Sequence, residues 1–210
     1  MSSISALKNI HLNGQFGDYE DKNEKDLLKI TEKKDLLIVQ IVQYKNSTLS
    51  FDSLTIDGLK LINKPLSVSN NNDTRILWNG PKNWLLTSNK LELIKEIQEK
   101  FNEKDFAVTD LSHSKAIIEI EGKWTKEVLK KGCPFNFNDL YENNCLNSTY
   151  NGMSITVDIL SDNPDKVRIF SLRSFGESLY SSLTDASLEF GYIGESVSYT
   201  HLRAHETHEH

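Results

Sequence analysis

The stretch "CLNSTYNGMSITVDIL", residues 145–160, contains the strongest hairpin signal in the chain. Asn151 and Gly152 form a dipeptide that readily adopts the positive φ angles of a tight two-residue turn. Residues rich in β-branched side chains lie on both sides of it. Because such a turn joins two neighbouring strands in opposite directions, the stretch predicts that the chain is built on antiparallel sheet.

Other extended segments surround this hairpin. Short runs rich in β-branched residues at 36–44, 116–120 and 166–172 are typical of strands. The segment "TRILWNGPKNWLLTS", residues 74–88, contains two apolar runs separated by Asn, Gly and Pro, which favour a turn. We therefore expect a second hairpin there.

Three segments have apolar residues at helical spacing, namely 89–101, 124–131 and 174–190. Ser174 and Glu177 have the spacing of a capping box, so the last helix is expected to begin at Ser174 and to end at Gly191. The segment "SFDSLTIDGLKLI" suits either a short helix or extended chain, and we expect a helix that ends near Gly58.

The order of these elements predicts an α+β fold, in which helices pack against a mainly antiparallel sheet. Residues 1–35 are polar and are expected to form a loosely ordered arm, with at most a short helix around 27–30. Residues 36–196 contain no linker and no clear repeat, so a single domain is expected over them.

The charge distribution argues against nucleic acid as a partner. The formal net charge is −6, and lysines are mixed with acidic residues throughout, so no basic stripe is available for a phosphate backbone. The longest apolar run is far shorter than the ~20 residues that span a bilayer. The first residues also lack the apolar stretch of a signal peptide. We expect a cytoplasmic protein that does not bind membranes.

Cys133 lies in "KKGCPFNFND", residues 130–139, directly after the predicted helix 124–131. Gly132 is expected to close that helix in the left-handed conformation, and Pro134 prevents its continuation. A helix C-terminus disfavours a thiolate. Cys145, the other cysteine, is twelve positions away, which fits neither a redox pair nor a zinc motif. We therefore expect reduced cysteines and a structural role for Cys133.

His113 lies in "TDLSHSK", which contains the residue types of a hydrolase triad. On a strand Asp110 and Ser112 would point to one face and His113 to the other, so the three could not act together. His113 is better interpreted as a turn or interface residue. The chain also lacks both glycine-rich phosphate loops, and no nucleotide cofactor is indicated.

Four of the six histidines fall in the last ten residues, where His201 and His205 have the spacing of two ligands on one helix face. However, "VSYTHLRAHET", residues 197–207, looks like the translation of a widely used transposase sequencing adapter. Residues 197–210 are therefore expected to be an artefact of sequence assembly, and no metal site is assigned to them.

Three stretches together resemble the gamma subunit of heterotetrameric sarcosine oxidase. They are "RILWNGPKNWLL", "TDLSHSKAIIEIEGKWTKEVLKKGCPFNF" and "VRIFSLRSFGESLYSSLTDASLEFG". The resemblance covers residues 36–191 and is most specific in the last two of these stretches. Where the family usually has an aspartate in its cysteine motif, this chain has Asn136.

The resemblance implies a fold similar to the folate-binding domain of aminomethyltransferases, in a structural subunit with no catalytic residue, cofactor or metal of its own. In such complexes the alpha subunit carries FAD, NAD and the tetrahydrofolate site. The beta subunit carries FMN and oxidises sarcosine, and the delta subunit holds zinc. The assembly converts sarcosine, oxygen and tetrahydrofolate to glycine, hydrogen peroxide and methylenetetrahydrofolate.

Under this hypothesis the chain would dock onto the alpha subunit, and Arg173 and His113 are the candidate contact residues. Arg173 immediately precedes the predicted last helix, where a guanidinium can form a bidentate pair with a carboxylate. An internal salt bridge is an equal alternative for Arg173.

Two other functions were weighed. One is a stand-alone folate-binding protein like the iron-sulfur maintenance relatives, whose cysteine motif also begins "KGC" but does not continue with Pro, Phe and Asn. The other is a free-standing aminomethyltransferase, but those enzymes are much longer. They also need acids facing the folate, and this sequence does not reveal such acids.

Overall fold

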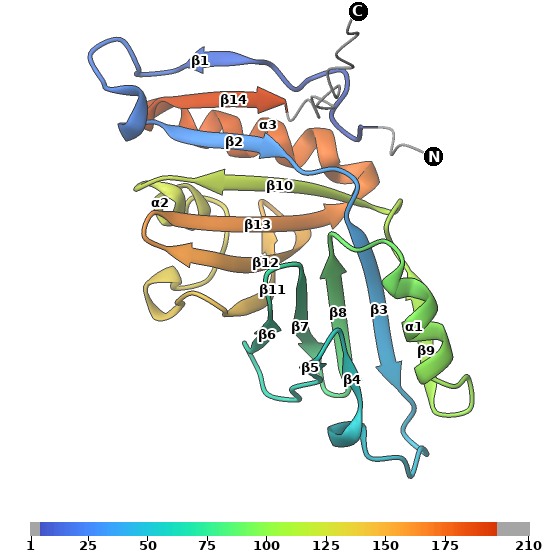
Figure 1. The fold of residues 1–210 in the computed structure, drawn as a ribbon. Coiled ribbons are helices and arrows are strands. Elements are labelled where there is room, and N and C mark those ends of the chain that lie inside the picture. Colours follow the sequence, from blue (N-terminus) through green and yellow to red (C-terminus); the bar gives the residue numbers. More distant parts are fainter. Residues whose placement is uncertain (1–4, 197–210) are drawn as a thin grey trace, which may run out of the picture.

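The computed structural model describes residues 5–196, which form two large sheets and one small one (Figure 1). The first sheet has seven strands. In spatial order these are β1 (Gly14–Phe16), β14 (Tyr192–Ser196), β2 (Leu28–Glu32), β10 (Lys115–Glu121), β13 (Asp165–Leu172), β12 (Met153–Asp162) and β11 (Cys145–Tyr150). All neighbours are antiparallel except β14 and β2, which run parallel.

The second sheet has five antiparallel strands. Their spatial order is β6 (Val68–Asn70), β7 (Thr74–Gly80), β8 (Asn83–Ser88), β3 (Leu37–Gln43) and β9 (Phe106–Asp110). A separate hairpin consists of β4 (Thr55–Ile56) and β5 (Leu59–Lys60). In Figure 1 the strands of the two large sheets run across one another.

Three α-helices accompany the sheets within the described part of the chain: α1 (Leu93–Lys100), α2 (Thr125–Lys130) and α3 (Gly176–Ser187). Short 3-10 helices add η1 (Glu24–Asp26), η2 (Phe51–Ser53), η3 (Phe137–Asp139), η4 (Arg173–Phe175) and η5 (Leu188–Phe190). None of the described helices combines the length and apolarity that a membrane crossing requires. The expected α+β architecture with mainly antiparallel sheet is confirmed.

Alternating residues of strand β3 pack into two different hydrophobic clusters. On β3, Leu37, Val39 and Ile41 pack with α1 in one cluster, whereas Ile38 faces the seven-stranded sheet in another, together with Leu36 just before the strand. A strand that is buried on both faces must be apolar at nearly every position. This explains why residues 36–44 form the longest apolar run in the sequence. The largest cluster lies between the seven-stranded sheet and helices α2 and α3.

A buried ion pair joins the two large sheets. Arg75 on β7 donates from Nε and Nη2 to the two carboxylate oxygens of Asp158 on β12, at 2.7 Å each. Arg75 also donates to the Asn143 side chain at 3.2 Å and to the Ile159 carbonyl at 3.2 Å. Such bidentate geometry is among the strongest available to an arginine, and it fixes β7 against β12.

Both predicted hairpins are confirmed. In the first, Tyr150 pairs with Met153 across a turn in which Asn151 and Gly152 have φ angles of 48° and 81°. Such angles are typical of the expected two-residue turn. In the second, Trp78 pairs with Trp84 at the end of β7 and β8.

The expectation for the N-terminal segment is wrong where the structure describes it. Strand β2 replaces the short helix expected around 27–30, and β1 adds a further strand. Leu28, Ile30 and Glu32 of β2 are buried on one face of the sheet. Glu32 is satisfied there, because its carboxylate accepts hydrogen bonds from the amides of Ala6 and Leu7. The segment therefore belongs to the seven-stranded sheet rather than to a loose arm.

Two helix expectations are also wrong. Residues 50–62 form η2 and the β4–β5 hairpin, so the extended alternative applies, and the Ser50 side chain caps only η2. The chain after β13 passes through η4 before α3 begins at Gly176, and no side chain caps the helix. The Ser174–Glu177 capping box therefore does not form. The adapter-like tail at 197–210 lies outside the described residues.

Candidate functional site

Cys133 is buried where α2 has just ended. Its thiol donates to the hydroxyl oxygen of Ser148 on β11 at 3.1 Å. Burial raises the pKa of this thiol, although the bond to Ser148 opposes the shift. A thiol with a raised pKa is protonated at neutral pH and is a poor nucleophile. The surroundings of Cys133 are therefore those of a packing residue.

Gly132 serves a different purpose from the one expected. It does not adopt a left-handed conformation, since it is not among the glycines with positive φ, and Lys131 before it is helical. A Cβ atom at Gly132 would instead lie 2.7 Å from the ring of Tyr150. Tyr150 is fully buried and donates its hydroxyl to the Val128 carbonyl of α2 at 3.0 Å. The glycine is required because this ring packs directly against the chain.

The turn between β9 and β10 contains His113. Asp110 accepts hydrogen bonds from the amide and hydroxyl of Ser112 at 2.9 and 2.6 Å, and the Ser112 hydroxyl oxygen accepts the Ile38 amide at 3.0 Å. Asp110 thus contacts Ser112 directly, without an intervening imidazole. The three residues do not form a triad, and His113 projects from an exposed turn.

Arg173 lies beside this turn. Its amide donates to the carbonyl of Ser114 at 2.9 Å, which joins the start of η4 to the β9–β10 turn. The structure therefore brings the segments of His113 and Arg173 together at one end of the seven-stranded sheet, but it places Cys133 in the core on the helix side. Leu172 and Phe175, on either side of Arg173 and Ser174, are 47% and 40% exposed. This end of the sheet thus carries both apolar and basic surface.

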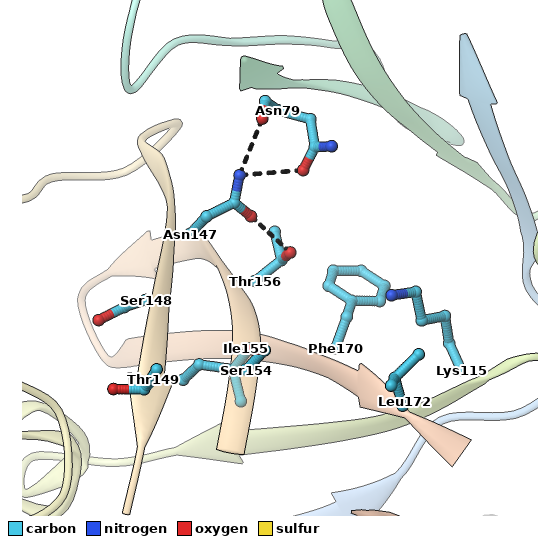
Figure 2. A pocket seen from close by; sticks show the side chains of 10 residues that line it. All are labelled: Asn79, Lys115, Asn147, Ser148, Thr149, Ser154, Ile155, Thr156, Phe170 and Leu172. Carbon is cyan, nitrogen blue, oxygen red and sulfur yellow. Dashed lines mark hydrogen bonds between the residues drawn. The ribbon is translucent and has the colours of Figure 1, made fainter. Parts of the chain in front are cut away.

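An open pocket of about 610 Å³ lies nearby, on the face of the sheet opposite the helices (Figure 2). Its lining comes from four adjacent strands of the seven-stranded sheet and from Asn79 of the β7–β8 hairpin. The residues are Asn79, Lys115, Asn147, Ser148, Thr149, Ser154, Ile155, Thr156, Phe170 and Leu172. Lys115 is the single charged residue of this set.

Hydrogen bonds hold one side of the pocket in place. Asn147 on β11 donates to the carbonyl and the side-chain oxygen of Asn79 at 3.0 Å each (Figure 2). The hydroxyl of Thr156 on β12 donates to the Asn147 side-chain oxygen at 2.7 Å. These bonds connect the second sheet to the first, so the polar wall of the pocket is preorganised.

Lys115 lies at the other side of the pocket, paired in register with Leu172 of β13. Burial lowers the pKa of its ammonium, because partial removal of water disfavours the charged form. A second recess also contains Lys115, and its lining includes both basic and acidic side chains, namely Lys33, Lys34, Arg173, Glu32 and Asp35. Lys115 therefore lies between the pocket and the second recess. Both are at the end of the sheet where the turn that contains His113 contacts the segment of Arg173.

The described residues contain no group of three or more His, Cys, Asp and Glu side chains that could hold a metal ion. His201 and His205 lie outside those residues. The sequence interpretation did not identify Lys115 or Asn147. Lys115 stands in the stretch that was singled out for His113, whereas no local pattern marks Asn147.

Comparisons with known proteins identify the fold. No protein-family model and no curated protein matches the chain. A solved structure does: a chain of heterotetrameric sarcosine oxidase from Corynebacterium sp. U-96, in complex with pyrrole 2-carboxylate, matches with a TM-score of 0.71 and 22% identity. The match covers 80% of this chain and 87% of that chain, so the two are similar in length.

A second structure, glycine cleavage system aminomethyltransferase T from Bartonella henselae, matches with a TM-score of 0.55 and 12% identity. It covers 76% of this chain but 46% of the aminomethyltransferase. The chain has an aminomethyltransferase-like fold. The expected fold is thereby confirmed, and at these identities the likeness concerns the fold.

Proposed function

We propose that this chain is the gamma subunit of a heterotetrameric sarcosine oxidase, a structural subunit without catalytic residues of its own. The observation that carries the proposal is the match to a chain of such an oxidase, at a TM-score of 0.71 and over most of both chains. The sequence resemblance in residues 109–137 and 167–191 points to the same subunit. The complex would oxidatively demethylate sarcosine to glycine, with tetrahydrofolate as one-carbon acceptor and hydrogen peroxide as the other product.

The arrangement of the site supports a docking role. The buried thiol of Cys133 has a raised pKa, and Ser112, Asp110 and His113 are not assembled for nucleophilic catalysis. The two motifs that carry the resemblance instead meet at an exposed end of the seven-stranded sheet. Surfaces that combine apolar and charged residues are typical of protein interfaces.

Under this proposal the partners are the alpha, beta and delta subunits. FAD, NAD and tetrahydrofolate would be bound by alpha, FMN by beta and zinc by delta, in the cytoplasm. This chain would bind the alpha subunit through the surface that contains His113 and Arg173.

Co-expression of the four chains tests the proposal. We expect the chain to co-purify with the other three subunits in equal amounts, and the chain alone to show no flavin absorbance and no peroxide production from sarcosine. Flavin or peroxide from the chain alone would contradict the proposal, as would an oxidase that assembles with normal activity when the chain is omitted.

The match to an aminomethyltransferase favours a second candidate, a stand-alone folate-binding protein. Carboxylates suit the donor edge of a pterin ring, but no acidic residue lines the pocket that contains Lys115 and Asn147. Titration of the purified chain with tetrahydrofolate distinguishes the two candidates. Saturable binding without any partner subunit would favour the folate-binding protein.

A further inference from the structure

We propose that Lys115 and the pocket beside it receive an acidic side chain from an extended segment of the partner subunit. This inference rests on the proposed role as a subunit of a complex, and it names the chemistry by which that complex would recognise this chain. The contact would be an ion pair, and the hydroxyl groups of β11 and β12 that line the same pocket would face the rest of the segment.

Lys115 has no partner within the described residues. Within residues 5–196 its ammonium makes neither an ion pair nor a hydrogen bond, although other part-buried lysines do, for example Lys126 with Asp165 at 3.3 Å. A cation that has lost part of its hydration without gaining a carboxylate is destabilising. A carboxylate supplied by a partner would remove that cost.

The ten residues that line the pocket include no acidic side chain. In the adjoining recess the carboxylate of Glu32 is already bonded to the amides of Ala6 and Leu7, and Lys34 lies 3.5 Å from it. Lys33, Arg173 and a second carboxylate, that of Asp35, line the same recess. At the pocket itself Lys115 is the single charged lining residue, so the surface there favours an anion, although the whole chain carries a net charge of −6.

The open shape of the pocket indicates which kind of ligand it can bind. Sites for small molecules are usually concave and bury most of the ligand. This pocket is instead an open depression on a sheet face, beside Leu172, which is 47% exposed. Phe175, the last residue of η4, adds further exposed apolar surface. An open polar depression with an apolar border fits a polypeptide segment better than a free small carboxylate.

The pocket also has polar groups for the backbone of such a segment. Thr149 and Ser154 face each other across β11 and β12 and both line the pocket. Their side-chain hydroxyls make no hydrogen bond within the part of the chain that the structure describes. Asn147 and Thr156, by contrast, are bonded to one another and serve as the fixed wall. An incoming segment would therefore meet these hydroxyl groups in the same pocket as Lys115, separated from it by β13.

The test measures the affinity of the purified chain for the complex of the other three subunits at low ionic strength. Lys115→Met keeps the apolar stem and removes the charge, and it is expected to weaken binding by about 10-fold or more. Lys115→Arg keeps the charge and should stay within about 3-fold of wild type. Lys60→Met, at an exposed lysine of β5, is the matched control and should have no effect.

Carbodiimide treatment of the assembled complex provides a second readout, because it joins a lysine to a carboxylate in direct contact. A cross-linked peptide between Lys115 and an acidic residue of the partner is expected. Equal affinity of wild type and Lys115→Met, with normal assembly, would overturn this inference and leave the subunit role intact. Failure of the wild type to assemble would overturn both.

A titration of the free chain with acetate separates the two sources of a carboxylate. Saturable binding at Lys115, observed by amide chemical shifts, together with an assembly affinity that Lys115→Met leaves unchanged, would assign the pocket to small carboxylates. That result would overturn the partner assignment.

Discussion

The two faces of the seven-stranded sheet are built from alternate residues of the same strands, yet they differ in how far they are covered and in how polar they are. On the helix face Ile118, Val157 and Ile169 are fully buried with Tyr150 beneath α2 and α3. On the opposite face the same strands carry Lys115, Thr156 and Phe170, and only part of that face is covered by the second sheet. The conspicuous cysteine motif therefore belongs to the face closed by the helices. Lys115, which makes no ion pair within residues 5–196, belongs to the open face.

The difference shows that a prominent motif need not mark the functional surface. Gly132 and Cys133 attract attention in the sequence, but they are explained by a tyrosine ring and a buried thiol. Lys115 is one lysine among many in the sequence, and it becomes notable only when the strands are paired. The comparison predicts that changes on the closed face alter stability and that changes at the open pocket alter assembly.

The largest effect is expected at the covered part of the open face, where Arg75 pairs with Asp158. Arg75→Met should destabilise the fold by about 3–5 kcal/mol, because it leaves a fully buried carboxylate without its cation. Urea unfolding measures the change. The control is Lys100→Met, which removes an exposed pair with Glu96 and should cost about 0.5 kcal/mol or less. Similar losses in the two variants would show that the sheets are not held together by this pair.

A smaller effect is expected on the closed face. Gly132→Ala should cost about 1–3 kcal/mol, because its Cβ would meet the ring of Tyr150. A double-mutant cycle with Tyr150→Leu checks the cause, since the smaller side chain makes room for the new methyl group. The two changes together should cost less than their sum. Strict additivity would mean that the glycine is needed for another reason.

The smallest effect of the three is expected at the thiol. Cys133→Ala should cost about 1 kcal/mol through lost packing. Under the proposed function, it should also leave turnover of the assembled oxidase within a few-fold of wild type. Turnover and unfolding of the same preparation give both values. A thousand-fold loss of turnover in an intact assembly would identify Cys133 as a catalytic thiol.

Local signals predicted a large part of this fold. The Asn151–Gly152 turn and the long apolar run at 36–44 have direct physical meanings, and both were interpreted correctly. Strand β2 was missed because its buried face includes Glu32, whose carboxylate is satisfied by distant amides of the N-terminal segment. The capping box failed because η4 intervenes before α3. Such tertiary contacts leave no trace in the local pattern.

The candidate site was less accessible to sequence interpretation. The turn of His113 and the start of η4 at Arg173 were both singled out, and the structure joins them through the carbonyl of Ser114. The pocket itself depends on pairing across β10, β13, β12 and β11, which brings Lys115 and Asn147 to the same face. No spacing rule connects two residues that are separated in the chain by α2 and η3 and in the sheet by β13 and β12.

Hydrogen–deuterium exchange of the free and assembled chain tests the contrast between the two faces most directly. On assembly with the other three subunits, we expect new protection in residues 111–115, 147–156 and 172–175, and unchanged exchange in α2 and in residues 131–139. Protection confined to α2 and residues 131–139, with none around Lys115, would contradict the assignment of the open face as the docking surface.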